Sequence, residues 1–315
     1  MGVIRYLRMD QVKPSVLEAG IVKTVAWFSL FDYPLTAFDI WKWLGVKSSF
    51  AEVEETLRTS LWLRGRLEAK EGLFVLGGRS AEGIIATHQE RFLDAARKFK
   101  KLGWAAKYFS FFPFVRAVFA CNTLAWHHTA PESDIDLFIV VSPGTIWLTR
   151  LLLVTPFRLL GRRPKQTTVD PFCFSFFVTD ENLSLKDLLL SEGDPYMAYW
   201  LASLVPVFDR DEIQNRLNEK NNWAFNFLPN AFLVPSQPRG RGRSPHQTWR
   251  KGVGDFLETL AKRFQQKFLP EPIKNAANLD SRVVVSDSVL KFHLNDRRAH
   301  FRDEWKKIYE AYGAS

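Results

Sequence analysis

The chain has 315 residues, of which 46% are hydrophobic and 24% are charged. This composition excludes disordered, collagen-like and coiled-coil proteins, and the length predicts two domains, or one domain with an appended module. Two cysteines, Cys121 and Cys173, are too few for a disulfide framework or a cysteine-built zinc site, which favours a reducing compartment. The first ten residues carry Arg5, Arg8 and Asp10 and do not resemble a secretion signal. Because no apolar stretch is long enough to span a bilayer, we expect a cytoplasmic protein without a membrane span.

The net charge of +9 is unevenly distributed. It is +2 over residues 1–80, +4 over 81–130, −4 over 131–230 and +7 over 231–315. A protein built only to hold nucleic acid would be basic along its contact face. An acidic segment between basic flanks suits a divalent metal with a phosphorylated ligand, and a solvated acidic surface is the alternative.

The first 80 residues predict three helices followed by a hairpin. Apolar residues at three- and four-residue spacing predict a helix over 16–30, and Thr36 can cap a second helix that runs to Leu44. Ser49 and Glu52 form a capping box that opens the third helix. Residues 67–76 then predict two strands around a Glu71-Gly72 turn. This order of elements is typical of a winged helix.

The third helix of a winged helix can enter the major groove of DNA. Here it carries Glu52, Glu54 and Glu55 before its first base, Arg58, and these carboxylates would repel DNA phosphates. We therefore favour protein docking or intramolecular packing over DNA reading. The basic residues around the hairpin support the DNA alternative: Arg64, Arg66 and Lys70.

The remaining chain predicts a mixed α/β core followed by helical segments. A helix runs to about Leu102, and the basic run over 97–101 near its end complements the helix dipole. Residues 235–246 combine three prolines, two glycines and three arginines and predict a flexible basic linker. Basic amphipathic helices are expected over 247–269 and 296–312, and these helices and the linker are candidate nucleic-acid contacts. The expected domains are a winged-helix-like domain (1–80), the core (81–183), a helical extension (184–234), the linker (235–246) and a C-terminal helical region (247–315).

The residues that point to chemistry lie between Val115 and Val141. Residues 115–120 predict a strand, 121–123 a turn, 124–128 a short helix and 134–141 a second strand. Alternation along the second strand places Asp134 and Asp136 on one face. Two neighbouring carboxylates on a strand suited to burial are costly unless a cation lies between them, and oxygen ligands suit Mg²⁺ or Mn²⁺.

The turn before the short helix offers a place for an anion. A helix that begins at Thr123 or Leu124 would present free backbone N–H groups and a hydroxyl to the terminal phosphates of a ligand.

This stretch resembles the polymerase-beta-type nucleotidyltransferase superfamily. Its signature is an apolar strand, Gly-Ser, about a dozen residues, and Asp-x-Asp in a second apolar strand. Here Asn122-Thr123 stands in place of Gly-Ser, and Asp134 follows Thr123 by eleven residues within the motif SDIDLFIVV at 133–141. The resemblance covers residues 110–180. Asn122 departs from the family's glycine, although asparagine tolerates positive φ better than most residues.

The resemblance implies a site and a reaction. Asn122, Thr123 and Ser133 would bind the nucleotide, and Asp134 and Asp136 would bind the metal ions. A third carboxylate is expected on a strand over 167–178, where Asp170 is preferred to Asp180 because Asp180 fits a turn. This third carboxylate would help to deprotonate an acceptor hydroxyl, which attacks the α-phosphorus and expels pyrophosphate.

We therefore expect a magnesium- or manganese-dependent nucleotidyltransferase that uses a nucleoside triphosphate, with ATP as the first choice. The acceptor would be RNA, a protein or a small molecule. The alternative is a non-catalytic regulatory protein with a degenerate transferase domain and a winged helix that binds nucleic acid or protein. Peripheral membrane attachment through the Phe- and Trp-rich surface is a third interpretation.

Other residues have simpler structural explanations. The pair His127-His128 predicts a surface turn, because adjacent side chains rarely converge on one ion. Cys173 lies in a Phe-rich strand and predicts core packing. Five apolar residues fit the buried face of one helix that crosses the sheet: Trp147, Leu148, Leu151, Leu152 and Leu159.

Overall fold

The computed structural model describes residues 13–233 and 253–315. It is 51% helix and 15% strand, with a six-strand mixed sheet and a small three-strand sheet, which confirms the predicted mixed α/β class. The predicted linker over 235–246 and the start of the helix expected over 247–269 lie outside the described residues. The described residues divide into two compact units: residues 13–88, 225–233 and 300–315 form the first, and residues 89–224 and 253–299 form the second.

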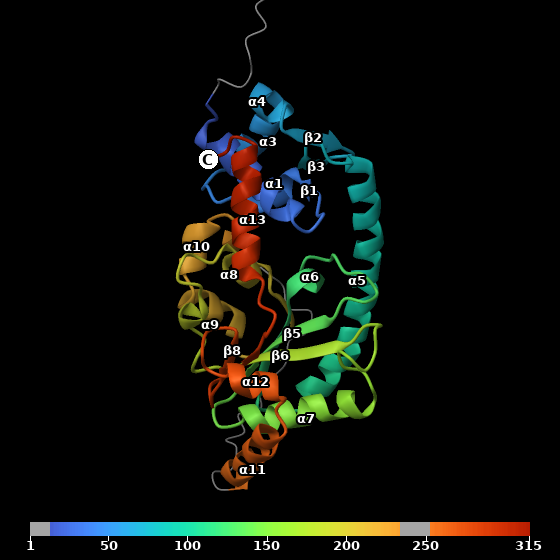
Figure 1. Ribbon diagram of the computed structural model, residues 1–315, viewed down its shortest axis with the longest axis vertical. Coiled ribbons are helices and arrows are strands. Elements are labelled where there is room, and N and C mark those ends of the chain that lie inside the picture. Colours follow the sequence, from blue (N-terminus) through green and yellow to red (C-terminus); the bar gives the residue numbers. More distant parts are fainter. Residues whose placement is uncertain (1–12, 234–252) are drawn as a thin grey trace, which may run out of the picture. The chain divides into compact units, whose positions relative to one another are not determined.

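The first unit begins with the predicted helices and hairpin (Figure 1). Ser15, Thr36 and Ser49 each cap a helix through a complete capping box, so local sequence fixes where these helices begin. The short strand β1 pairs antiparallel with β3, which pairs antiparallel with β2. The elements are α1 (Val16–Ser29), β1 (Leu35–Thr36), α2 (Ala37–Lys42), α3 (Phe50–Thr59), α4 (Leu61–Arg64), β2 (Leu67–Lys70), β3 (Leu73–Leu76) and the start of α5 (Ala81–Ser110).

Two later segments complete the first unit. They contain α10 (Trp223–Phe227), a short 3₁₀ turn at Ala231–Leu233 and α13 (Arg298–Ala311). The indole of Trp305 on α13 packs edge-on against Trp27, with ring centroids 5.6 Å apart, and donates a hydrogen bond to the Lys23 carbonyl. The buried amide of Asn230 donates to the carbonyls of Trp41 and Val46. Each unit thus combines segments that the sequence assigned to separate, continuous domains, because these contacts join residues far apart in sequence.

The second unit is built on a six-strand sheet with the order β7-β4-β5-β6-β9-β8. β5 and β6 pair in parallel, and the other neighbours pair antiparallel. The strands are β4 (Val115–Ala120), β5 (Ile135–Val141), β6 (Phe172–Thr179), β7 (Val205–Asp209), β8 (Val283–Val285) and β9 (Val289–Phe292). The helices, besides most of α5, are α6 (Asn122–Ala125), α7 (Ile146–Leu159), η2 (Lys186–Leu188), α8 (Pro195–Ser203), α9 (Ile213–Lys220), α11 (Val253–Lys267) and α12 (Glu271–Ala276).

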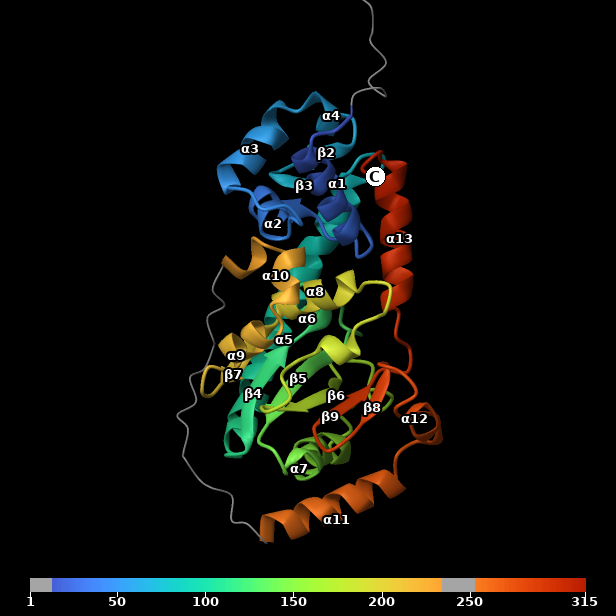
Figure 2. The same cartoon turned by 90° about the vertical axis from the view of Figure 1, so that its left-hand side faces the viewer.

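Helices cover both faces of this sheet (Figure 2). α7 makes the crossover between the parallel strands β5 and β6, and together with α5 it buries one face in an aromatic and aliphatic core. On the other face Trp200 of α8 packs against Phe138 and Phe176, with ring centroids 5.2 and 5.6 Å apart. A strand buried on both faces reads as a continuous apolar run, which explains the sequence of β5.

The structure differs from two expectations for the second unit. Strands β8 and β9 extend the sheet between the two predicted helices, inside the region over 247–315 that was expected to be helical. These strands have three and four residues, too few to show a period, and they depend on pairing with the distant β6. Leu159 was expected on the buried face of its helix but is 80% exposed, because it is the last residue of α7, after Pro156.

Within the described ranges 13–233 and 253–315, no helix combines the length and the apolar character needed to cross a membrane.

Candidate functional site

Three side chains with metal-binding atoms converge where β5 and β6 begin. Ligand atoms of Asp134, Asp136 and Cys173 all lie within 4.8 Å of one another. Asp136 and Cys173 are register partners in the parallel ladder, so their side chains share one face of the sheet. The structure therefore brings together the two aspartates that the sequence pairs, and it adds a cysteine that the sequence assigned to the core.

Backbone hydrogen bonds fix this end of the sheet. The N–H of Cys121, just past β4, donates to the carbonyl of Asp136, and the N–H of Ile135 donates to the carbonyl of Pro171. These bonds hold the end of β4 and the starts of β5 and β6 together. The two carboxylates are thus supported by a buried sheet.

Asn122 orients the carboxylate of Asp136. It has φ of 55°, a left-handed conformation that asparagine tolerates, and it begins α6. Its side-chain amide donates to Asp136 Oδ2 at 2.9 Å, and its amide oxygen accepts a hydrogen bond from the Tyr196 hydroxyl at 3.3 Å. The turn expected around Asn122 is present, and the asparagine side chain supplies a contact that glycine could not make.

Loss of water raises the pKa of both aspartates. Burial raises the pKa of Asp136 to about 6; the hydrogen bond from Asn122 opposes this shift, and the negative charge of Asp134 adds to it. Burial also raises the pKa of Asp134, with Lys98 acting in the opposite direction. Two carboxylates held this close are stabilised by a bound cation, which replaces their protons.

Cys173 lies on β6, beside Asp134 and Asp136. Burial, together with the negative charge of Asp136, raises the pKa of its thiol well above the ordinary value. The Sγ atom of this thiol and a carboxylate oxygen of Asp136 lie within 4.8 Å of each other. A neutral thiol is a poor ligand for Mg²⁺, which prefers oxygen. The group therefore offers a hard cation two carboxylates.

Asp170, the expected third carboxylate, lies away from Asp134 and Asp136. Its side chain is 2% exposed and forms ion pairs with Arg97 and Lys101 of α5. Burial alone would raise its pKa, but hydrogen bonds from Arg97 and Lys101 outweigh burial and lower the pKa to about 2. β6 begins at Phe172, so Asp170 precedes the strand in a left-handed conformation with φ of 51°. The structure does not bring this carboxylate into the group formed by Asp134 and Asp136.

The other candidate, Asp180, lies past the far end of β6. Its carboxylate pairs with Arg116 at 3.4 Å and with Arg216 at 3.6 Å. Among the residues that the structure describes, no third carboxylate joins Asp134 and Asp136.

Ser133 and Thr123, which were expected to bind phosphate, also make hydrogen bonds within the protein. The hydroxyl of Ser133 accepts a hydrogen bond from the Ala130 N–H, which tightens the loop before β5. The carbonyl of Thr123 accepts from the His128 N–H. α6 is a single turn that begins at Asn122, whereas a helix over 124–128 was expected, and one turn has too small a dipole to hold a triphosphate alone.

The basic run over 97–101 has a role that was not predicted. α5 continues to Ser110, so this run lies inside the helix and does not complement its end. Lys98 is fully buried; its ammonium donates to the carbonyls of Ala130 and Ser133 and pairs with Asp94 at 3.2 Å. It therefore anchors the loop that leads to Asp134. The signal was the spacing of residues 94, 97, 98 and 101, which places them on one helix face.

The expectation of a surface turn at the two histidines is wrong for His128. His128 is 2% exposed, and its Nε2 lies 2.7 Å from a guanidinium nitrogen of Arg91. His127 is half-buried between the rings of Phe92 and Phe99. The turn packs against α5, a contact between segments that local sequence does not reveal.

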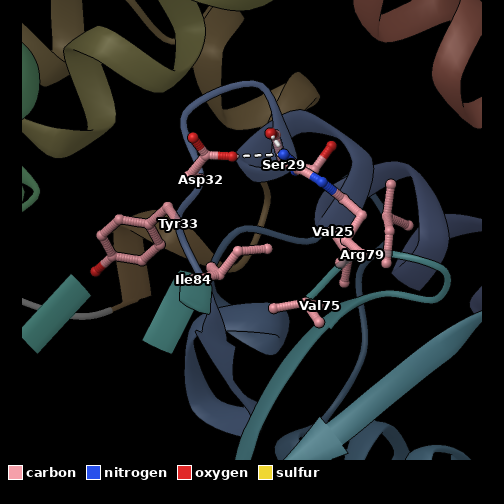
Figure 3. Close-up of a pocket in the computed structure, with 8 residues that line it drawn as sticks. Val25, Ser29, Asp32, Tyr33, Val75, Arg79 and Ile84 are labelled. Carbon is pink, nitrogen blue, oxygen red and sulfur yellow. Dashed lines mark hydrogen bonds and ion pairs between the residues drawn. The ribbon is translucent and has the colours of Figure 1, made fainter. Parts of the chain in front are cut away.

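Two pockets in the part of the chain that the structure describes differ in the space they offer a ligand. The one in the first unit is closed: Arg79 pairs with Asp32, donates to the Ser29 carbonyl and leaves no space for a water molecule (Figure 3). The second, of about 320 Å³, lies beside Asp170 and is lined by α5, α7 and the start of β6. It is on the face of the sheet opposite the aspartate pair, because Phe172, which lines it, belongs to the core under α5 and α7.

The chain matches no protein-family model, no curated protein and no solved structure.

Proposed function

We propose that the second unit is a polymerase-beta-type nucleotidyltransferase domain that binds a nucleoside triphosphate with a divalent cation and transfers a nucleotidyl group to an acceptor hydroxyl. The observation that carries the proposal is the convergence of Asp134 and Asp136 at the start of β5. The order β4, α6, β5, α7 and β6, with β5 antiparallel to β4 and parallel to β6, supports it.

The donor set fits one hard cation. Asp134 and Asp136 would hold Mg²⁺ or Mn²⁺ through carboxylate oxygens, and water and phosphate oxygens would supply the remaining ligands. When bound, the cation neutralises the triphosphate and makes an acceptor hydroxyl more acidic. Asn122 keeps the Asp136 carboxylate in place, and Lys98 holds the loop before Asp134. The backbone turn at Asn122 and Thr123 would contact the terminal phosphates.

A second candidate is nucleotide binding without transfer, and a specific observation favours it. The position on β6 beside Asp136 holds the neutral thiol of Cys173, while the carboxylate of Asp170 is neutralised by Arg97 and Lys101. A thiol with a raised pKa does not accept a proton from an acceptor hydroxyl. In this form the domain would sense a nucleotide and pass the signal to a partner.

For the first unit we propose a winged-helix-like module that docks on protein. The three helices, the hairpin and the pairing of β1 with β3 match that architecture. Its third helix, α3, exposes Glu52, Glu54 and Glu55. These carboxylates favour a basic protein surface over DNA phosphates.

The test is transfer of label from α-phosphate-labelled ATP, GTP, CTP and UTP to the protein itself and to macromolecules of a host lysate, with Mg²⁺ or Mn²⁺. Wild type is compared with Asp134→Asn/Asp136→Asn and with the control Asp187→Asn, which removes an exposed carboxylate. We expect label with wild type and with the control but not with the double variant. Sensitivity of the labelled product to nuclease or protease identifies the acceptor class.

Cys173→Asp separates the two candidates. If wild type binds the metal nucleotide without transferring label and Cys173→Asp gains transfer, the binding function is correct. If neither protein binds a nucleotide in the presence of a divalent cation, both candidates are wrong.

A further inference from the structure

The face that α11 turns toward the second unit is small and polar. Gly254, Ala261 and Gln265 are buried there, at the spacing of one helix face. The carboxylate of Glu258 accepts hydrogen bonds from the N–H groups of Trp147 (2.9 Å) and Leu148 (2.7 Å) at the start of α7, where a negative charge is favourable. α11 is thus fixed in a defined orientation against α7 (Figure 2).

A second face of α11, beside the buried one, is apolar and exposed. Phe256 and Phe264 on α11 and Phe268 just past its end expose 63%, 55% and 61% of their surface. The exposed apolar residues recur at three- and four-residue spacing from the start of the helix to the residue after it: Val253, Phe256, Leu257, Leu260, Phe264 and Phe268.

This arrangement reverses the usual polarity of a surface helix. A helix on a globular protein normally buries its apolar stripe and exposes its polar side chains. If α11 rotated to bury the phenylalanines, Glu258 and Gln265 would lose four hydrogen bonds to α7. A continuous apolar stripe exposed in this way marks an interaction surface.

The charges around the stripe indicate what covers it. Arg263 and Lys267 are exposed on α11 and form no ion pair among the described residues. The sequence immediately before α11, residues 235–252, contains five basic residues and no acidic one: Arg239, Arg241, Arg243, Arg250 and Lys251. An amphipathic helix rich in phenylalanine beside a polybasic segment matches an anionic lipid surface, which offers apolar chains and negative headgroups together.

We propose that the apolar face of α11 docks on an anionic membrane surface, with the helix lying in the plane of the interface. At about 1.5 Å per residue, α11 is too short to span a bilayer but long enough to lie along it. This site is independent of the aspartate pair, which lies on the opposite face of the sheet from α7.

The test is co-sedimentation of the full chain with vesicles of phosphatidylcholine, with and without phosphatidylserine. Phe256→Ser/Phe264→Ser removes the centre of the stripe, and Leu93→Ser/Phe111→Ser, the matched control, removes two apolar residues that are at least as exposed, one on α5 and one just past its end. We expect binding to phosphatidylserine vesicles that weakens with salt, falls about tenfold or more in the first variant and is unchanged in the second. Arg263→Glu/Lys267→Glu keeps the apolar stripe but reverses two charges, and it should also weaken binding to phosphatidylserine vesicles.

Three results would overturn the proposal. The first is failure of the wild type to bind phosphatidylserine vesicles. The second is equal loss of binding in the two serine variants. The third is a wild-type dimer in sedimentation without vesicles that Phe256→Ser/Phe264→Ser makes monomeric, because a second copy would then cover the face. None of these results depends on nucleotide binding, so the membrane proposal and the nucleotidyltransferase proposal can fail separately.

Discussion

Asp136 and Cys173 lie opposite each other in the parallel ladder of β5 and β6, and their ligand atoms lie within 4.8 Å of each other. This arrangement places a sulfur where a third oxygen ligand would complete a cation site. It also makes Cys173 the residue at which cation affinity is most directly altered.

Cys173→Asp should raise affinity for Mn²⁺ about tenfold or more at pH 7, because it adds a third carboxylate to the group. The same change should lower the free energy of unfolding without metal by about 1–3 kcal/mol, because three carboxylates then repel one another in a partly buried site. Calorimetric titration and urea unfolding measure the two effects. Cys173→Ser is the matched control and should leave the affinity near that of wild type; equal affinity in Cys173→Asp would contradict the assignment of the site.

Asp136→Asn should stabilise the metal-free protein above pH 6, by on the order of 1–3 kcal/mol. The pKa of Asp136 is about 6 in the folded protein and starts from an ordinary value of 3.8, so the folded state holds the proton more tightly. Wild type therefore loses stability as the pH rises from about 4 to about 6 and keeps that penalty above pH 6. Urea unfolding between pH 4 and pH 8 should show this slope in wild type and a reduced slope in the variant.

The affinity for a cation should also depend on the protonation of Asp136, and it should increase as the pH rises. Because a cation must displace the proton of Asp136, affinity for Mn²⁺ should fall about tenfold per pH unit below pH 6 and level off above it. Titration at several pH values checks the profile. A flat profile would show that Asp136 is not a ligand.

Asp170→Asn should destabilise the protein by about 2–3 kcal/mol at pH 7, because it leaves Lys101 without its carboxylate and leaves Arg97 paired with Asp94 alone. The pKa of Asp170 is lowered to about 2, so its contribution is present above pH 4 and is lost as the pH falls from about 4 to about 2. Wild type and variant should therefore converge in stability near pH 2. Cation affinity should not change in this variant. A large loss of affinity would show that Asp170 is a metal ligand after all.

Asn122 allows its backbone and side-chain roles to be separated. Asn122→Gly keeps the left-handed turn and removes the hydrogen bond to Asp136, so the pKa of Asp136 should rise further and cation affinity near pH 6 should fall. Asn122→Ala removes the same bond and adds strain at positive φ, which should cost about 1 kcal/mol more in unfolding. Equal stability of the two variants would contradict a left-handed residue at this position.

Local sequence predicted the elements whose signals lie within a few residues. The capping box at Ser49, the turn at Glu71-Gly72 and the apolar runs of β4 and β5 all appear in the structure where they were expected. Alternation also placed Asp134 and Asp136 together, because Asp134 directly precedes the strand that carries Asp136.

The rest of the site depends on partners far apart in sequence. Asp170 precedes a strand and is the nearest acidic candidate, but its cations lie on α5, more than sixty residues earlier. Cys173 faces the aspartates only because of the register between β5 and β6, and a shift of one residue would turn it to the other face. Lys98 is spaced like a surface residue of a helix, and only the fold shows that it is buried.

The first unit needs the last residues of the chain. Trp305 covers Trp27, and the hydroxyl of Tyr312 donates to the Gly77 carbonyl at 2.6 Å. Residues 16–76 are translated long before residues 300–315, which pack against them. A protein truncated before α13 would therefore expose Trp27 for a chaperone or a protease to recognise.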